Sequence, residues 1–119
     1  VKGDTFRIEQ VLTNYLNNAI KNVNNENIIR ISIDDSLNNN LIRISVFNSG
    51  NHIADEDMPR IWNRLYKADS SRNREKGGSG IGLSLVRAIM KQHGNEYGVY
   101  NVKNGVNFWF ELNKADISI

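Results

Sequence analysis

A cluster of glycines stands directly before an apolar run with helical periodicity. Residues 76–83 read KGGSGIGL, so Gly78, Gly80 and Gly82 alternate with other residues at the start of LSLVRAIMKQHG. Glycine costs about 0.5–1 kcal/mol relative to alanine inside a helix, so such a cluster indicates unusual backbone angles or a close approach to the backbone. A helix N-terminus with free N–H groups binds phosphate well. The cluster therefore indicates a phosphate loop, and a flexible hinge or a C-cap turn is the alternative.

Two common phosphate loops do not fit this stretch. A Walker A loop ends in Gly-Lys-Ser or Gly-Lys-Thr, whereas the order here is Gly-Ile-Gly-Leu. A dinucleotide fingerprint follows a hydrophobic strand, whereas these glycines follow the polar stretch SSRNREK. The glycine loop belongs to a third class.

A second candidate set consists of amides on the helix that we predict for residues 6–23, with Asp4 as its N-cap. Asparagine is a poor helix former, so several amides on one face make sense if they coordinate a ligand. A solvated surface in an asparagine-rich chain is the alternative. At about 100° per residue, one polar stripe opposite the apolar face holds Arg7, Gln10, Asn14, Asn17, Asn18 and Lys21.

A third candidate is the stretch VFNSGNHI, which follows a clear strand pattern. Asn48 and Gly50 lie just past the predicted end of that strand, where a short side chain can turn toward a ligand. An ordinary turn is the simpler explanation for these residues taken alone.

The composition limits what this chemistry can be. The chain has 119 residues, 39% hydrophobic and 24% charged, which suits one soluble domain without a membrane helix or an export signal. The absence of cysteine excludes disulfides and thiolate metal sites, and the separation of His52 from His93 argues against zinc. A net charge of +2 predicts no polyanionic partner.

The remaining elements must position these candidates. Alternating apolar residues predict strands over 27–34 and 41–47, joined by a hairpin turn at 35–40. We expect a short helix over 55–66, a long polar loop, and a helix over 79–92 that Gly94 stops. A second hairpin follows over 96–102 and 106–112, with Asn104 and Gly105 in its turn. This order suggests a mixed or antiparallel sheet with helices on one face.

Together, these segments resemble the catalytic and ATP-binding domain of bacterial sensor histidine kinases, within the GHKL ATPase superfamily. The similar stretches are FRIEQVLTNYLNNAIKN (N box), NSGNHI (G1), IWNRLYKAD (F box), GGSGIGL (G2) and a divergent G3, NGVNFWFEL. The resemblance covers almost the whole chain and implies a single domain over residues 1–119. The implied fold is an α/β (α+β) two-layer sandwich of Bergerat type, with a mixed, mostly antiparallel sheet of about five strands and three helices on one face.

The resemblance implies a site for ATP and Mg²⁺. It makes Asn14 and Asn18 the catalytic residues. Asn18 would be the metal ligand, and Asn14 would orient the phosphates or metal-bound water. Lys21 would add positive charge beside them. One protein oxygen plus phosphates and waters suits the octahedral preference of Mg²⁺. Arg72, Arg74 and Lys76 fit further phosphate contacts or a solvated surface. The implied nucleotide-binding residues are Asn18, Lys21, Asn48, Gly50, Tyr66, Lys67, Gly78, Gly80, Gly82 and Leu83.

Some positions depart from the family pattern. Asn48 stands where the family has an aspartate that accepts a hydrogen bond from the adenine amino group; an amide oxygen can accept that bond without charge assistance. His52 replaces the second G1 glycine, and the F-box aromatics appear as Trp62 and Leu65.

The resemblance implies that the chain donates the γ-phosphoryl group of ATP to a histidine on a separate dimerisation helix, which then serves a response regulator. A non-catalytic nucleotide-binding module and a GHKL ATP hydrolase are the alternatives. Related hydrolases have a glutamate where this chain has Asn14, and an amide cannot act as a general base. We expect a cytoplasmic domain of a membrane-anchored protein, without its dimerisation and phosphoacceptor domain.

Overall fold

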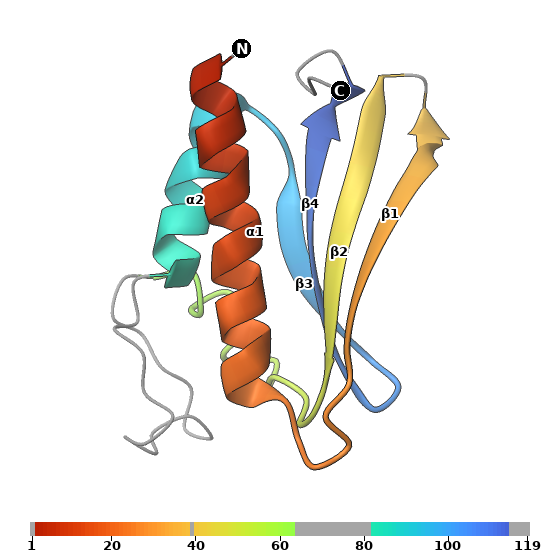
Figure 1. Ribbon diagram of the computed structural model, residues 1–119. Coiled ribbons are helices and arrows are strands. Elements are labelled where there is room, and N and C mark those ends of the chain that lie inside the picture. Colours follow the sequence, from red (N-terminus) through yellow and green to blue (C-terminus); the bar gives the residue numbers. More distant parts are fainter. Residues whose placement is uncertain (1, 39, 64–81, 115–119) are drawn as a thin grey trace.

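A four-stranded sheet backed by helices forms the structure, a computed structural model that describes residues 2–38, 40–63 and 82–114 (Figure 1). The strand order is β1-β2-β4-β3, and every neighbouring pair is antiparallel. Both helices lie on the same side of the sheet. The elements are α1 (Lys2–Asn22), β1 (Ile29–Asn38), β2 (Leu41–Ser49), α2 (Gly82–His93), β3 (Tyr97–Val102) and β4 (Gly105–Asn113).

The two-layer α/β arrangement is confirmed, but its details differ from the expectation. Within the described residues there are two helices and four strands, and the sheet is antiparallel throughout, whereas three helices, about five strands and a mixed sheet were expected. Antiparallel pairing follows from the connections, because two of the three strand pairs are joined by short hairpins.

The first helix is confirmed and begins earlier than predicted. It runs over Lys2–Asn22, so Asp4 lies in its first turn and the N-cap assignment is wrong. The reason is that a carboxylate is favourable anywhere in the first turn of a helix, so its presence does not fix the first residue. Val11, Tyr15 and Ala19 are buried against the sheet, as the helical spacing indicates.

The segment after β2 is not a regular helix. Residues 55–62 form successive turns, in which the Asp57 N–H donates to Ala54 O at 2.9 Å and the Ile61 N–H donates to Asp57 O at 3.0 Å. Pro59 has no N–H to give to the carbonyl four residues earlier, so the pattern breaks where an α-helix would need that bond. The last residues of the predicted helix, 64–66, lie outside the described part.

The hairpin turns are tighter than predicted. β1 continues to Asn38, with a register irregularity after Asp34, so most of the predicted turn at 35–40 is strand. In the second hairpin the turn residues are Lys103 and Asn104, because Gly105 already pairs with Val102. Asn104 adopts a left-handed conformation with φ of 69°, which asparagine tolerates well.

The end of α2 follows the sequence pattern. The helix ends at His93, and Gly94 has φ of 75° while its N–H donates to Met90 O at 2.9 Å. This is the left-handed cap that glycine favours, so the predicted stop is confirmed. The predicted start at residue 79 lies outside the described part, which resumes at Gly82.

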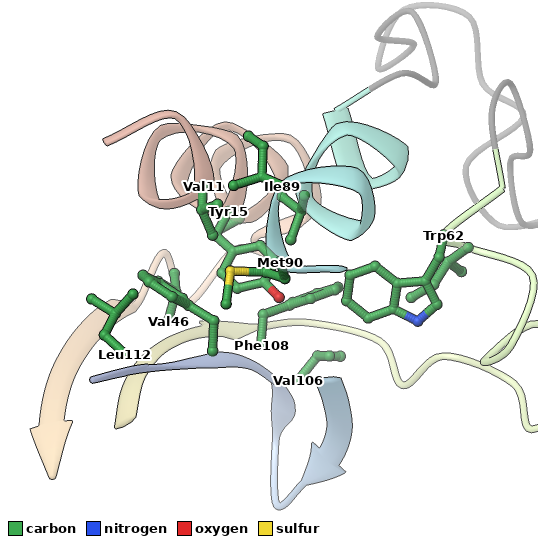
Figure 2. Close-up of a cluster of buried hydrophobic side chains, with 13 residues drawn as sticks. Val11, Tyr15, Val46, Trp62, Ile89, Met90, Val106, Phe108 and Leu112 are labelled. Atoms are coloured by element: carbon green, nitrogen blue, oxygen red, sulfur yellow. The ribbon is translucent and has the colours of Figure 1, made fainter. Parts of the chain in front are cut away.

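The hydrophobic core fills the space between the helices and the β2–β4 face (Figure 2). Tyr15 lies at its centre, and its ring centroid is 5.2 Å from that of Phe108 and 5.8 Å from that of Phe110. Trp62, from the turns after β2, packs edge-on against Tyr97 at 4.9 Å. This packing fixes the turn segment and both helices to one sheet.

The helix layer leaves the face of β1 uncovered. Ile29, Ile31 and Ile33 lie on the helix side of β1, yet they are 36%, 49% and 68% exposed. α1 packs over β2, one strand farther in. Along the described part of the chain, neither helix has the length and apolarity that crossing a membrane requires.

Candidate functional site

Two segments far apart in the sequence meet where α2 begins. A Cβ added to Gly82 would lie 3.1 Å from Oδ1 of Asn14, which is tighter than an ordinary van der Waals contact. Asn14 is partly buried on the flank of α1 that faces α2. The missing side chain of Gly82 therefore gives the Asn14 amide room beside the N-terminus of a helix, where phosphate binds well.

Asn18 and Asn22 continue from Asn14 at intervals of one helical turn. Nδ2 of Asn22 donates to the backbone O of Asn18 at 2.8 Å and to its Oδ1 at 3.2 Å. Asn18 is partly buried, and Lys21 is exposed beside this row. At 1.5 Å per residue, the three amides extend over about 12 Å of helix.

Asn48 lies at the other end of this amide row and is 2% exposed. It belongs to the helix side of β2, between Ile29 of β1 and Val106 of β4. Its Nδ2 donates to the backbone O of Ser49 at 3.1 Å, which fixes the amide plane. A buried amide held in this way has a defined direction for its acceptor oxygen.

Gly50 joins Asn48 to the end of α1. Its φ is 152°, and an added Cβ would lie 2.7 Å from the backbone O of Asn22 and 3.3 Å from Nδ2 of Asn48. Only glycine fits this position, because both the backbone angle and the space exclude a side chain. The amide row on α1 therefore leads from Gly82 at one end to Asn48 and Gly50 at the other.

The loop that follows β2 is hydrogen-bonded to the end of β3 and to the turn between β3 and β4. The Gly50 N–H donates to Asn104 O at 3.0 Å, and Nε2 of His52 donates to Val102 O at 2.7 Å. The side chain of Asn101 makes two bonds to the backbone of Ile53. The sequence pattern did not identify Asn101; an asparagine inside an apolar strand, where it is unfavourable, was the available signal.

The other predicted site residues lie partly in the core and partly outside the described residues. Leu83 is partly buried and packs against the hydrophobic core. Trp62 is a core residue. The rest of the F box and the glycine loop lie outside the described residues, so their roles remain predictions: Leu65, Tyr66, Lys67, Arg72, Arg74, Lys76, Gly78 and Gly80.

The described part of the site is nearly free of acidic ligands. Over residues 2–38, 40–63 and 82–114, no group of three or more His, Asp, Glu or Cys side chains could hold a metal ion. The oxygen donors beside α2 are neutral amides instead.

A family model described as histidine kinase-, DNA gyrase B- and HSP90-like ATPase matches residues 3–116. The chain belongs to this ATPase family. A similar curated protein is sensor histidine kinase YkoH of Bacillus subtilis (strain 168), 41% identical over 99 residues, which are 83% of this chain and 21% of the relative. This ATPase-family chain therefore spans about a fifth of that relative's length.

Solved structures show the same fold for this ATPase-family chain. The catalytic domain of histidine kinase ThkA, in a nucleotide-free form, aligns with a TM-score of 0.75 at 34% identity, covering 92% of this chain and 68% of that one. The structure of ThkA in complex with the response regulator protein TrrA aligns with a TM-score of 0.72 at 33% identity. The alignment covers 92% of this chain and 29% of that one. These matches confirm what the motifs implied: the chain is a histidine kinase ATPase domain of the GHKL superfamily.

Proposed function

We propose that the chain binds Mg-ATP and donates the γ-phosphoryl group to a histidine on a separate dimerisation helix, as an ATP-dependent protein histidine kinase of a two-component system. One observation carries the proposal: the amide row on α1 runs from the start of α2, at Gly82, to the buried Asn48 and Gly50. This arrangement can hold phosphates at one end and a base at the other.

The metal would be held at Asn18. Its side-chain oxygen accepts a long 3.2 Å bond from Asn22, an interaction that a stronger cation contact can replace. A neutral amide suits Mg²⁺ when phosphates and waters supply the other oxygens. When bound, the ion neutralises charge on the transferring phosphoryl group. The exposed Lys21, three residues after Asn18 on α1, would add positive charge beside the metal.

Asn14 would orient the phosphates without acting as a base. Its amide is set against the N-terminus of α2, where orphan N–H groups point outward. An amide cannot take a proton from water at neutral pH, which favours transfer to a side-chain acceptor over hydrolysis. Catalysis would then rest on positioning and on charge neutralisation.

Asn48 would accept a hydrogen bond from the adenine amino group. Because Nδ2 is engaged by Ser49 O, the side-chain oxygen is the atom left to face a base. Replacing Asn48 with alanine should weaken adenine-nucleotide binding and reduce the preference for adenine over guanine. Unchanged affinity and selectivity in Asn48→Ala would remove this assignment.

Calorimetry with a non-hydrolysable ATP analogue, with and without Mg²⁺, tests the binding step. We expect the gain in affinity on adding Mg²⁺ to disappear in Asn18→Ala and to persist in Asn17→Ala, a neighbouring exposed amide on the same helix. Absence of binding by the unmodified chain under both conditions would overturn the proposal.

Labelled ATP tests the transfer step. Incubating the chain with Mg²⁺, ATP and the proposed dimerisation domain should label that domain on histidine. Tight binding without transfer would instead indicate a non-catalytic nucleotide-binding module, an alternative that the neutral Asn48 favours. Release of phosphate without an acceptor would indicate a hydrolase.

The wider setting is part of the same proposal. The structure of ThkA with TrrA supports a response regulator as the protein that receives the phosphoryl group. We place the domain in the cytoplasm, within a longer kinase anchored in the membrane. Purification of the full-length protein with the membrane fraction would support that location.

A further inference from the structure

The β3–β4 hairpin, from the end of β3 to the start of β4, contacts the segment from Asn48 to Ile53, which holds the proposed adenine ligand Asn48. The two segments run antiparallel, so residues 104, 102 and 101 of the hairpin bond in turn to residues 50, 52 and 53 of the loop. A Cβ on Gly105 would overlap the backbone O of Asn48, which shows how closely the backbones approach. The further bonds join Asn104 O to the Gly50 N–H, Val102 O to His52, and the Asn101 side chain to Ile53.

Asn101 makes the last of these contacts and the one with two bonds. Its Oδ1 accepts the Ile53 N–H at 2.9 Å, and its Nδ2 donates to the Ile53 carbonyl at 2.9 Å. A carboxamide is the side chain that presents an acceptor and a donor in one plane, so it matches the backbone of a residue as a neighbouring strand would. Asp lacks the donor, and Ser offers a single short hydroxyl.

The position of Asn101 on β3 places the two bonds to Ile53 in a partly buried environment. Tyr97 and Val99 point toward the core, so Asn101, two residues farther on, lies on the same helix-facing side, opposite Val106. Ile53 is itself packed against the core. These bonds therefore join two partly buried groups, where a hydrogen bond is stronger than at an exposed surface.

The loop from Asn48 to Ile53 is consequently held at both ends. At Asn48 it is held by the pairing of β2 with β1 and β4. At Ile53 it is held by Asn101. Between them, Gly50 lies so close to Asn22 O that no side chain fits there, and Gly50 and His52 each bond to the β3–β4 hairpin.

We propose that Asn101 is a positioning residue for the base pocket, which acts through Ile53 to fix the loop that follows Asn48. This inference rests on the proposed nucleotide-binding function. Asn101 does not contact the nucleotide in this scheme; it sets the distance between the loop and the buried amide of Asn48. Discrimination between bases depends on that distance, because a hydrogen bond weakens steeply when its geometry is lost.

A comparison of Asn101→Ala with the unmodified chain tests the proposal. The expected result is a dissociation constant for a non-hydrolysable ATP analogue that is roughly tenfold higher, with a smaller ratio of ATP-analogue to GTP-analogue affinity. Hydrogen exchange at the Ile53 amide should also become faster. A role in stability alone would lower the melting temperature without changing the ratio for the folded protein.

Two further variants keep the test decisive. Asn101→Asp preserves the shape and the acceptor for the Ile53 N–H but loses the donor, so it should show the same change in base selectivity if Asn101→Ala does not fold. Tyr100→Ser is the control on the same strand, since Tyr100 faces the opposite side and is 45% exposed. It should leave both affinities unchanged.

The outcomes separate this inference from the function on which it rests. If the unmodified chain binds the ATP analogue and both Asn101 variants keep its affinity and base ratio, the positioning role is overturned and the proposed function stands. If the unmodified chain binds neither analogue, the proposed function fails and this inference fails with it.

Discussion

Oδ1 of Asn14 occupies the space that a side chain on Gly82 would need, at 3.1 Å from the position of its Cβ. Residues separated by most of the chain thus share one small volume at the start of α2. In Gly82→Ala we expect the Asn14 amide to move and nucleotide affinity to fall roughly tenfold, since small displacements of positioning groups are costly. Stability should change by less than about 1 kcal/mol, because alanine is the better helix former. Calorimetry and urea unfolding measure the two effects.

Gly94→Ala is the matched control with the opposite outcome. A Cβ there meets nothing within 4 Å, but φ is 75°. Stability should fall by about 1–2 kcal/mol for the left-handed backbone, with nucleotide affinity unchanged. Equal losses of affinity in both variants would show that the Asn14 contact is irrelevant.

Asn48→Asp should separate affinity from stability. The carboxylate restores the charged acceptor of the family pattern, and charge-assisted hydrogen bonds are about twice as strong as neutral ones, so we expect tighter ATP binding. The same change removes the Nδ2 donor to Ser49 O at a site that is 2% exposed. Unfolding free energy should drop by about 1–3 kcal/mol. A folded Asn48→Asp variant that binds ATP more weakly than the unmodified chain would contradict the proposed role.

Gly105→Ala should be strongly destabilising. The added Cβ would overlap the backbone O of Asn48 and lie 2.7 Å from Cε1 of Phe47, and backbone atoms cannot move aside cheaply. Overpacking of this kind costs about 3 kcal/mol or more here. Urea unfolding monitored by circular dichroism measures the loss; a change below about 1 kcal/mol would show that the hairpin approaches β2 less closely.

Tyr15 should make stability fall at alkaline pH. Burial raises its pKa above the ordinary value of 10.0, and nearby Tyr97 adds to the increase. The unfolded chain therefore loses this proton first, and the stabilisation that is complete below about pH 10 is lost as the pH rises toward the folded pKa. Melting temperatures from about pH 9 to pH 11 should fall less steeply in Tyr15→Phe. That variant also loses the bond from the Tyr15 hydroxyl to Trp109 O, so only the slope is diagnostic. Parallel slopes would refute the assignment.

Because β1 is uncovered, an isoleucine-to-alanine change there should cost less unfolding free energy than the same change in the core. Ile33 is 68% exposed, whereas Ile89 of α2 is 1% exposed. Ile33→Ala should change unfolding free energy by less than about 1 kcal/mol, and Ile89→Ala should cost about 2–5 kcal/mol. Similar losses in guanidinium unfolding would mean that β1 is covered in solution.

Local patterns predicted most of the elements correctly. The apolar spacing of α1, the alternation in each strand and the stop at Gly94 depend on backbone geometry within a few residues, which the sequence specifies directly. The prediction of a helix over 55–66 was wrong for the turns at 55–62, because the N–H that Pro59 lacks falls where the helix would need it.

The candidate site was only partly predictable, because local patterns do not specify which distant segments meet. Asn14, Asn48 and Gly82 could be selected from their motifs, but their proximity depends on how α1 packs against both α2 and the sheet. Asn101 belongs to no motif of the sequence, and its proposed role depends on Ile53, which is close to it only in space.

The sequence by itself determined the family and the order of the strands and of the two described helices, and it predicted which residues would contact a nucleotide, because residue types and short spacings encode them. The tertiary structure alone decided which strand face the helices cover, which loop the second hairpin clamps, and which two glycines make room for Asn14 and Asn22. Those are long-range contacts, and they are set by the packing of whole elements against one core rather than by any local pattern.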